Sequence, residues 1–105
     1  SFELTGTFAE NSLNEISIDT TFLGIQALDL DLGAMSLHED EALVNRKLAE
    51  RSNQVILVSD SSKFNKRLFA VICELDKIDK IITDSNIDKN FRQSIEQKGI
   101  EVVIA

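Results

Sequence analysis

The fold of this chain is decided by the stretch Val55-Ile56-Leu57-Val58-Ser59-Asp60-Ser61-Ser62-Lys63-Phe64. It begins as an unbroken run of β-branched residues and leucine, and it ends in an acid, two hydroxyls and a lysine. A continuous apolar run of this length is typical of a strand buried on both faces, which is the habit of parallel sheets. Ligands of open α/β sheets bind beyond the carboxyl ends of the strands. The stretch therefore predicts a buried parallel strand followed directly by a candidate binding site.

The segment upstream of this strand predicts a helix and then a strand. Thr7 and Glu10 have the spacing of a capping box, and apolar residues at helical intervals extend the expected helix over about residues 8–16. Residues 17–25 have the composition of a strand, and a loop is expected to follow as far as Gly33. Ser36 and Glu39 form a second capping box, which predicts a helix reaching about Ser52. The apolar stripe of that helix is expected at Leu37, Val44 and Leu48.

The downstream segment predicts two more strands and one helix. Residues 68–75 are apolar and fit either a short strand or one turn of helix, and the pattern does not choose between them. Residues 80–83 predict a strand that ends at Asp84, and residues 101–104 predict the closing strand. The helix between them is indicated by apolar residues four positions apart, with glycine as its stop signal: Ile87, Phe91, Ile95 and Gly99.

Helices placed between strands imply parallel pairing, so we expect a layered α/β fold with a mostly parallel, Rossmann-like sheet flanked by helices. With 105 residues the chain is one domain or part of one, long enough to bury a single core. The formal charge of −7, from 18 acidic and 11 basic residues, makes direct binding to a nucleic-acid backbone unfavourable. A single cysteine without metal-ligand spacing favours a reducing, cytoplasmic setting, and no apolar run indicates a membrane span. We therefore expect no metal, no cofactor and no catalytic residue.

Asp60-Ser61-Ser62-Lys63 is the first candidate site. A lysine supplies charge to a phosphate, and serine hydroxyls with exposed backbone N–H groups supply directed donors. The alternative is a polar turn that merely ends a strand.

Three further places carry polar groups that could reach a pocket. Gly24 at a strand end would let a ligand approach the backbone, although a loop glycine serves turns as often. Glu41 and Asn45 lie one helical turn apart and could face a pocket, although a solvated helix face is the commoner outcome. His38, without a second ligand or a nucleophile, is expected at the surface. The following residues are expected to play no chemical role: Cys73 as a small buried hydrophobe, and the acidic pairs Asp29/Asp31 and Glu39/Asp40 as solvating loop or helix groups.

The pattern resembles the effector-sensing domain of DeoR-type bacterial transcriptional repressors. The most specific pieces are the DSSKF box that ends at Phe64 and the ITD box that ends at Asp84. Weaker pieces match family motifs along nearly the whole chain: Gly6-Thr7-Phe8-Ala9-Glu10 with Leu13, Asp19-Thr20-Thr21-Phe22-Leu23-Gly24, Gly33 with Glu41-Ala42, Val44 and Arg46, and Glu101-Val102-Val103-Ile104.

The resemblance implies a sensor related in fold to ribose-5-phosphate and glucosamine-6-phosphate isomerases. It implies that residues 1–105 are the C-terminal part of a ligand-sensing domain, with the DNA-binding winged helix-turn-helix outside this chain. The implied partners are a small phosphorylated sugar, further copies of the chain in a homo-oligomer, and DNA through the missing domain only.

Carried over residue by residue, the resemblance implies an effector site made of the box and its neighbours: Asp60, Ser61, Ser62, Lys63, Gly24, Gln26, Glu41 and Asn45. Ala27 stands where the family more often has a second glycine, and Asn45 stands where the isomerase relatives carry their catalytic glutamate. Because an amide cannot abstract a proton, the enzyme alternative, a phosphosugar isomerase, would have to use Glu41. A pure oligomerisation module with a decayed pocket is the other alternative.

Overall fold

The computed structural model describes residues 17–105, and the helix expected at residues 8–16 lies outside them. The described elements, in chain order, are β1 (Ile18–Gly24), β2 (Ala27–Asp29), β3 (Gly33–Ser36), α2 (Glu39–Glu50), β4 (Ser52–Val58), the 3₁₀ turn η1 (Ser61–Lys63), β5 (Ala70–Cys73), the 3₁₀ turn η2 (Leu75–Lys77), β6 (Lys80–Thr83), α3 (Lys89–Gln97) and β7 (Glu101–Ile104). No helix of this described part is long and apolar enough to cross a membrane.

Four strands form a parallel sheet in the order β1-β4-β6-β7, which confirms the predicted α/β class. The deciding stretch supplies β4, whose central residues Val55, Ile56 and Leu57 are buried. The strand begins three residues earlier than its apolar run predicts, because Ser52 and Gln54 pair with the first half of β1. Polar residues can extend a strand wherever a neighbouring strand accepts their hydrogen bonds.

A second, antiparallel sheet of order β2-β3-β5 occupies the segment that was predicted to be a loop. The loop prediction for residues 26–33 is therefore wrong, and the undecided segment 68–75 contains strand β5. Gly33 fixes this arrangement: it has φ 90°, and a Cβ placed there would lie 2.2 Å from the carbonyl oxygen of Cys73. Only glycine fits a site with both a left-handed backbone and a carbonyl at that distance.

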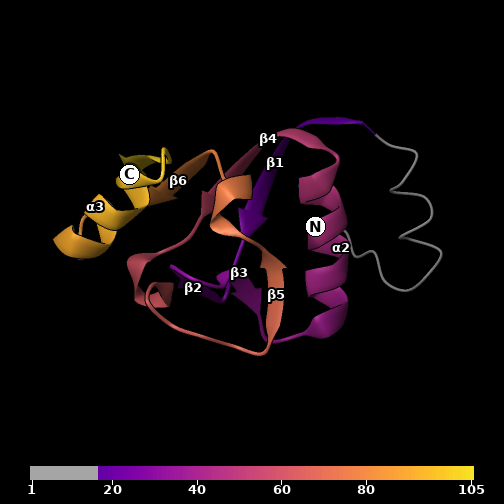
Figure 1. The fold of residues 1–105 in the computed structure, drawn as a ribbon, viewed down its shortest axis with the longest axis horizontal. Helices are drawn as coiled ribbons and strands as arrows, with labels where there is room; N and C mark the ends of the chain where they lie inside the picture. Colours follow the sequence, from indigo (N-terminus) through magenta and orange to yellow (C-terminus); the bar gives the residue numbers. More distant parts are fainter. Residues whose placement is uncertain (1–16) are drawn as a thin grey trace.

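Both helices pack on one side of the parallel sheet. The buried cluster joins alternate residues of the central strands, such as Leu57 and Ile81, to Ala42 of α2 and to Phe91 and Ile95 of α3. Figure 1 shows the two helices at opposite ends of the molecule, with the antiparallel sheet between them. On the other side of the parallel sheet, Phe22 and Val58 are exposed.

The two helices agree with their sequence signals to different degrees. α3 begins at the cap Asp88, whose carboxylate accepts the N–H of Phe91, and Gly99 follows its end with φ 87°, so this prediction is confirmed. α2 is capped by His38 without a side-chain hydrogen bond, so the Ser36–Glu39 capping box is wrong. It ends at Glu50 and buries its alanines, while Leu37, which was expected in its apolar stripe, is exposed.

Candidate effector-binding site

The carboxyl ends of three parallel strands meet at one edge of the sheet. Gly24, the last residue of β1, lies beside Val58 of β4, and Val58 lies beside Ile82 of β6. The backbone N–H of Ser59 continues the ladder by donating to the carbonyl of Ile82, 3.1 Å away. The loops that carry Gln26, the DSSKF box and Asp84 therefore leave the sheet at the same edge.

Two carboxylates hold the DSSKF box in shape. Asp60 caps η1, and its Oδ1 accepts the backbone N–H of Ser62 at 3.0 Å and the hydroxyl of the same serine. Asp84, which follows β6, accepts the backbone N–H of Ser61 at 2.8 Å and the Ser61 hydroxyl at 2.7 Å, together with the N–H of Asn86. The sequence marked Asp84 as the end of a strand and of the ITD box without giving it a contact, so this bracing role is a finding of the structure.

The same hydrogen bonds keep both carboxylates ionised. The Ser62 hydroxyl is the main cause that lowers the pKa of Asp60, and the Ser61 hydroxyl is the main cause that lowers the pKa of Asp84. Hydrogen bonds donated to the charged form of a carboxyl favour that form. The box is thus bordered by two negative charges at neutral pH.

This bracing changes what the box offers to a ligand. The backbone N–H groups of Ser61, Ser62, Lys63 and Phe64 all have acceptors within the loop or at Asp84, so they are not the free donors that the sequence suggested. Lys63 is half-buried and forms no ion pair with any residue in the described part of the chain. Its ammonium is the cation of the box that remains open to an anionic ligand.

The other predicted site residues are placed as follows. Gln26 connects the end of β1 to the start of α2, because its Oε1 accepts the hydroxyl of Ser36 at 3.1 Å and the N–H of Leu37. Glu41 is exposed and Asn45 is half-buried on α2. No hydrogen bond or ion pair between described residues connects either of them to the DSSKF box, so their part in the effector site stays a prediction.

The chain matches a family model and several named proteins. The model of the DeoR C terminal sensor domain matches residues 1–85. The chain belongs to this family. It is 38% identical over 99 residues to a candidate aga operon transcriptional repressor of Escherichia coli O157:H7, covering 94% of this chain and 37% of that protein. It is 38% identical over 100 residues to the HTH-type transcriptional regulator GlpR of Haloferax volcanii, covering 95% of this chain and 39% of GlpR.

A third relative of this DeoR sensor domain is the HTH-type transcriptional repressor GlcR of Bacillus subtilis, which is 28% identical over 101 residues, covering 96% of this chain and 39% of GlcR. The chain thus spans about two fifths of the length of these relatives. The relatives' names are those of transcriptional regulators, and a further match, the L-fucose operon activator of Haemophilus influenzae, is named for a sugar operon.

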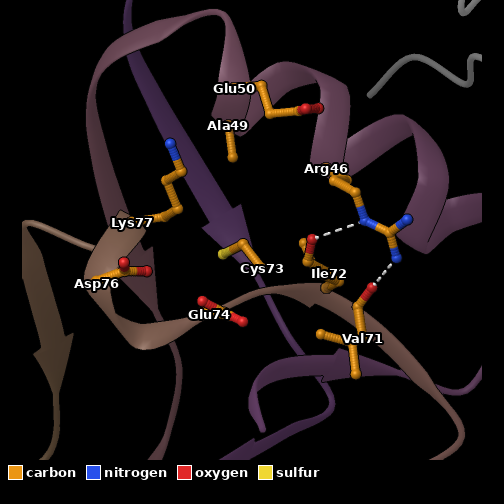
Figure 2. Close-up of a pocket in the computed structure, with 9 residues that line it drawn as sticks. All are labelled: Arg46, Ala49, Glu50, Val71, Ile72, Cys73, Glu74, Asp76 and Lys77. Carbon is orange, nitrogen blue, oxygen red and sulfur yellow. Dashed lines mark hydrogen bonds between the residues drawn. The ribbon is translucent and has the colours of Figure 1, made fainter.

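Arg46, which belongs to one of the DeoR-like motifs, connects α2 to the edge of β5. Its guanidinium donates from Nε to the carbonyl of Ile72 at 3.3 Å and from Nη2 to the carbonyl of Val71. Figure 2 shows these two bonds at one side of a cavity of about 380 Å³ that contains the side chain of Cys73. Cys73 is buried, as its sequence context predicted, and this burial raises the pKa of its thiol to about 11.

A buried ion pair contradicts the expectation that Asp29 and Asp31 only solvate a loop. Asp29 is buried at the end of β2 and accepts the N–H groups of Asp31 and Leu32 at 2.9 and 2.8 Å. Arg67 donates to Asp29 at 3.0 Å and to Asp31 at 3.3 Å. The pair ties the β2–β3 turn to the segment that follows the DSSKF box, and its partners are 38 residues apart, too far for a local sequence signal.

Proposed function

We propose that this chain is the effector-sensing and oligomerising portion of a DeoR-type transcriptional regulator, and that it binds a phosphorylated sugar at the carboxyl edge of its parallel sheet. The observation that carries the proposal is the DSSKF box at that edge, braced by Asp60 and Asp84 and presenting Lys63 without an ion-pair partner among the described residues. The names of the relatives support a regulator of sugar metabolism.

Phosphate binding at this box has a built-in consequence for its conformation. The hydroxyls of Ser61 and Ser62 already donate to Asp84 and Asp60, and a hydroxyl has one proton to give. A phosphate oxygen that accepts a hydrogen bond from either serine hydroxyl therefore has to replace the carboxylate that accepts that hydrogen bond now. Occupancy of the box is therefore coupled to the position of the segment after β6, which carries Asp84.

We infer that the regulator responds by a shift of population. The sugar phosphate binds one arrangement of the sensor better than the other, and in the whole protein this preference biases the operator affinity of the attached DNA-binding domain. A coupling free energy of about 1–3 kcal/mol is ordinary for such a switch. The acidic charge of −7 agrees with a cytoplasmic sensor that leaves DNA contact to another domain.

An NMR titration tests the ligand class. Ribose 5-phosphate, glucose 6-phosphate and inorganic phosphate are added to the chain, and saturable shifts are expected at residues 60–64 and at Gly24. Lys63→Ala should abolish these shifts, because it removes the open cation. Lys66→Ala is the matched control, since it removes an exposed lysine of the same charge three residues away. Equal binding by both variants would remove Lys63 from the site.

The same two variants test the regulation in the full-length protein. Lys63→Ala should abolish the response of operator binding to the inducer and leave operator binding itself intact, whereas Lys66→Ala should preserve both. Turnover of ribose 5-phosphate that is lost in Glu41→Gln would instead favour the isomerase alternative.

A further inference from the structure

A second cavity lies against the DSSKF box, where Ser61 and Phe64 of the box and the start of α3 contribute to its lining. Its volume is about 350 Å³, in the range of small-molecule sites. Its apolar part is built from Leu30 and from Phe64 and Phe91, whose rings stack with their centroids 5.3 Å apart. Both rings are buried, so the base of the cavity is set by the core of the protein.

Three asparagines surround this apolar base: Asn65, Asn86 and Asn90. Within residues 17–105, their side-chain amides make no hydrogen bond to the protein, although the backbone of each is fixed. A side-chain amide offers both a hydrogen-bond donor and an acceptor, and an alcohol hydroxyl can both accept from it and donate to it. Three unpartnered amides around an apolar base therefore match a molecule with several hydroxyls and an apolar face.

Asn65 occupies a strained position in this wall. Its φ is 59°, and within the described part of the chain it is the one residue other than glycine with a left-handed backbone. Its backbone N–H holds it there by donating to the carbonyl of Leu28 at 2.7 Å. Asparagine tolerates this conformation better than most side chains, and local strain of this kind is concentrated at ligand sites.

The charge of the cavity excludes an anion. Its lining contains the carboxylate of Asp88 and no lysine or arginine. Asp88 already accepts the N–H of Phe91 as the cap of α3, so the start of the helix is occupied by the protein itself. A phosphate or sulfate would meet a negative charge here without a compensating cation.

We propose that this cavity binds a neutral, polyhydroxylated molecule, a free sugar or a polyol. The two sites adjoin, because Ser61 and Phe64 of the DSSKF box line this cavity, but Lys63 does not line it and belongs to the phosphate proposal alone. The two proposals therefore fail separately: Lys63→Ala should leave this binding unchanged.

The test follows the side-chain NH₂ resonances of the three asparagines during titration of the chain with D-glucose, D-ribose, D-fructose, glycerol and mannitol. We expect saturable shifts with at least one of them, and dissociation constants raised about five- to tenfold by Asn86→Ala or Asn90→Ala, each of which removes an exposed amide. Asn65→Gly is a third variant, since glycine accepts the left-handed backbone and keeps the fold.

Gln93→Ala is the matched control, because Gln93 is an exposed amide on the same helix that does not line the cavity. It should bind as the unmodified chain does. The proposal is overturned if no member of the panel produces a saturable shift, or if the asparagine variants bind as tightly as the control. It is also overturned if inorganic phosphate shifts the same NH₂ resonances in the Lys63→Ala chain, in which the proposed phosphate site is lost, since that result would mean an anion site in this cavity.

Discussion

Breaking the ion pair between Asp29 and Arg67 should loosen the connection between the β2–β3 turn and the segment that follows the DSSKF box. Asp29 lies at the end of β2, and Arg67 lies in the segment between the DSSKF box and β5. The prediction concerns Arg67→Met, which keeps much of the apolar stem and removes the guanidinium. The companion variant is Asp29→Asn, which removes the charge of the carboxylate but keeps its shape.

The exposure of the two partners sets the magnitude. The Asp29 side chain is 10% exposed and that of Arg67 is 61% exposed, so the pair is half-solvated. A fully exposed pair contributes about 0.2–1 kcal/mol, and removing one partner of a fully buried pair costs about 3–5 kcal/mol. Asp29 keeps two backbone donors after Arg67 is lost. We therefore expect Arg67→Met to lower the free energy of unfolding by about 1 kcal/mol, and Asp29→Asn by about 2 kcal/mol.

The effect should depend on pH in a defined direction. The pKa of Asp29 is lowered from its ordinary value of 3.8, first by the N–H of Leu32 and also by Arg67. A carboxyl whose pKa is lower in the folded state stabilises the protein above its unfolded pKa, and this stabilisation is lost as the pH falls through the folded pKa. The difference in the free energy of unfolding between the unmodified chain and Arg67→Met should therefore have its full size at pH 7 and should shrink below pH 3.8.

The assay is urea unfolding followed by far-ultraviolet circular dichroism, because the sequence contains no tryptophan or tyrosine for a fluorescence signal. A double-mutant cycle of Arg67→Met with Asp29→Asn isolates the coupling between the two side chains. Lys66→Met is the control for loss of a neighbouring charge. A coupling free energy below about 0.3 kcal/mol at pH 7 would refute the claim that this pair joins the β2–β3 turn to the segment after the DSSKF box.

Three further predictions concern the framework around the site, each read out by the same unfolding assay. Gly33→Ala should destabilise the chain by about 2–5 kcal/mol, because its Cβ would lie 2.2 Å from the carbonyl oxygen of Cys73 on a left-handed backbone; a loss below about 1 kcal/mol would contradict this. Leu57→Ala should cost about 3–5 kcal/mol, since that side chain is fully buried and leaves a cavity, and an unchanged urea midpoint would be inconsistent with its place in the core. Arg46→Met should lower the free energy of unfolding by about 1–2 kcal/mol, because it loses two hydrogen bonds to β5. Arg92→Met is the control: it loses one exposed ion pair within a helix and should cost less than about 0.5 kcal/mol. Equal losses of stability in the two variants would argue against the role given to Arg46.

The parallel sheet was predictable because its signals are local. The apolar run at Val55–Val58, the strand at residues 80–83 and the closing strand at residues 101–104 all lie where the pattern placed them. The helix indicated by Phe91 and Ile95 also lies in its predicted place. Each of these elements buries a face whose period is visible within a few residues.

The antiparallel sheet could not be predicted in the same way. β2 and β3 are three and four residues long, too short to show a period, and they contain polar residues at their ends. β3 pairs with β2 on one side and, on the other, with β5, which lies more than 30 residues further along the chain. The capping box at Ser36 failed because the Ser36 hydroxyl donates to Gln26 and accepts the N–H of His38, the residue that caps α2 instead.

The same distinction between local signals and long-range contacts applies to the candidate site. The sequence alone identified the DSSKF box, its position after a buried strand and its resemblance to the DeoR sensor pattern, because residue type and order carry that information. The tertiary structure decided which donors of the box are already used, since Asp84 reaches Ser61 from 23 residues away. It also decided that Asp29 is paired with Arg67 and that three asparagines from separate segments surround one cavity. Contacts between distant segments depend on how the sheets and helices pack, and that packing leaves no local trace in the order of the residues.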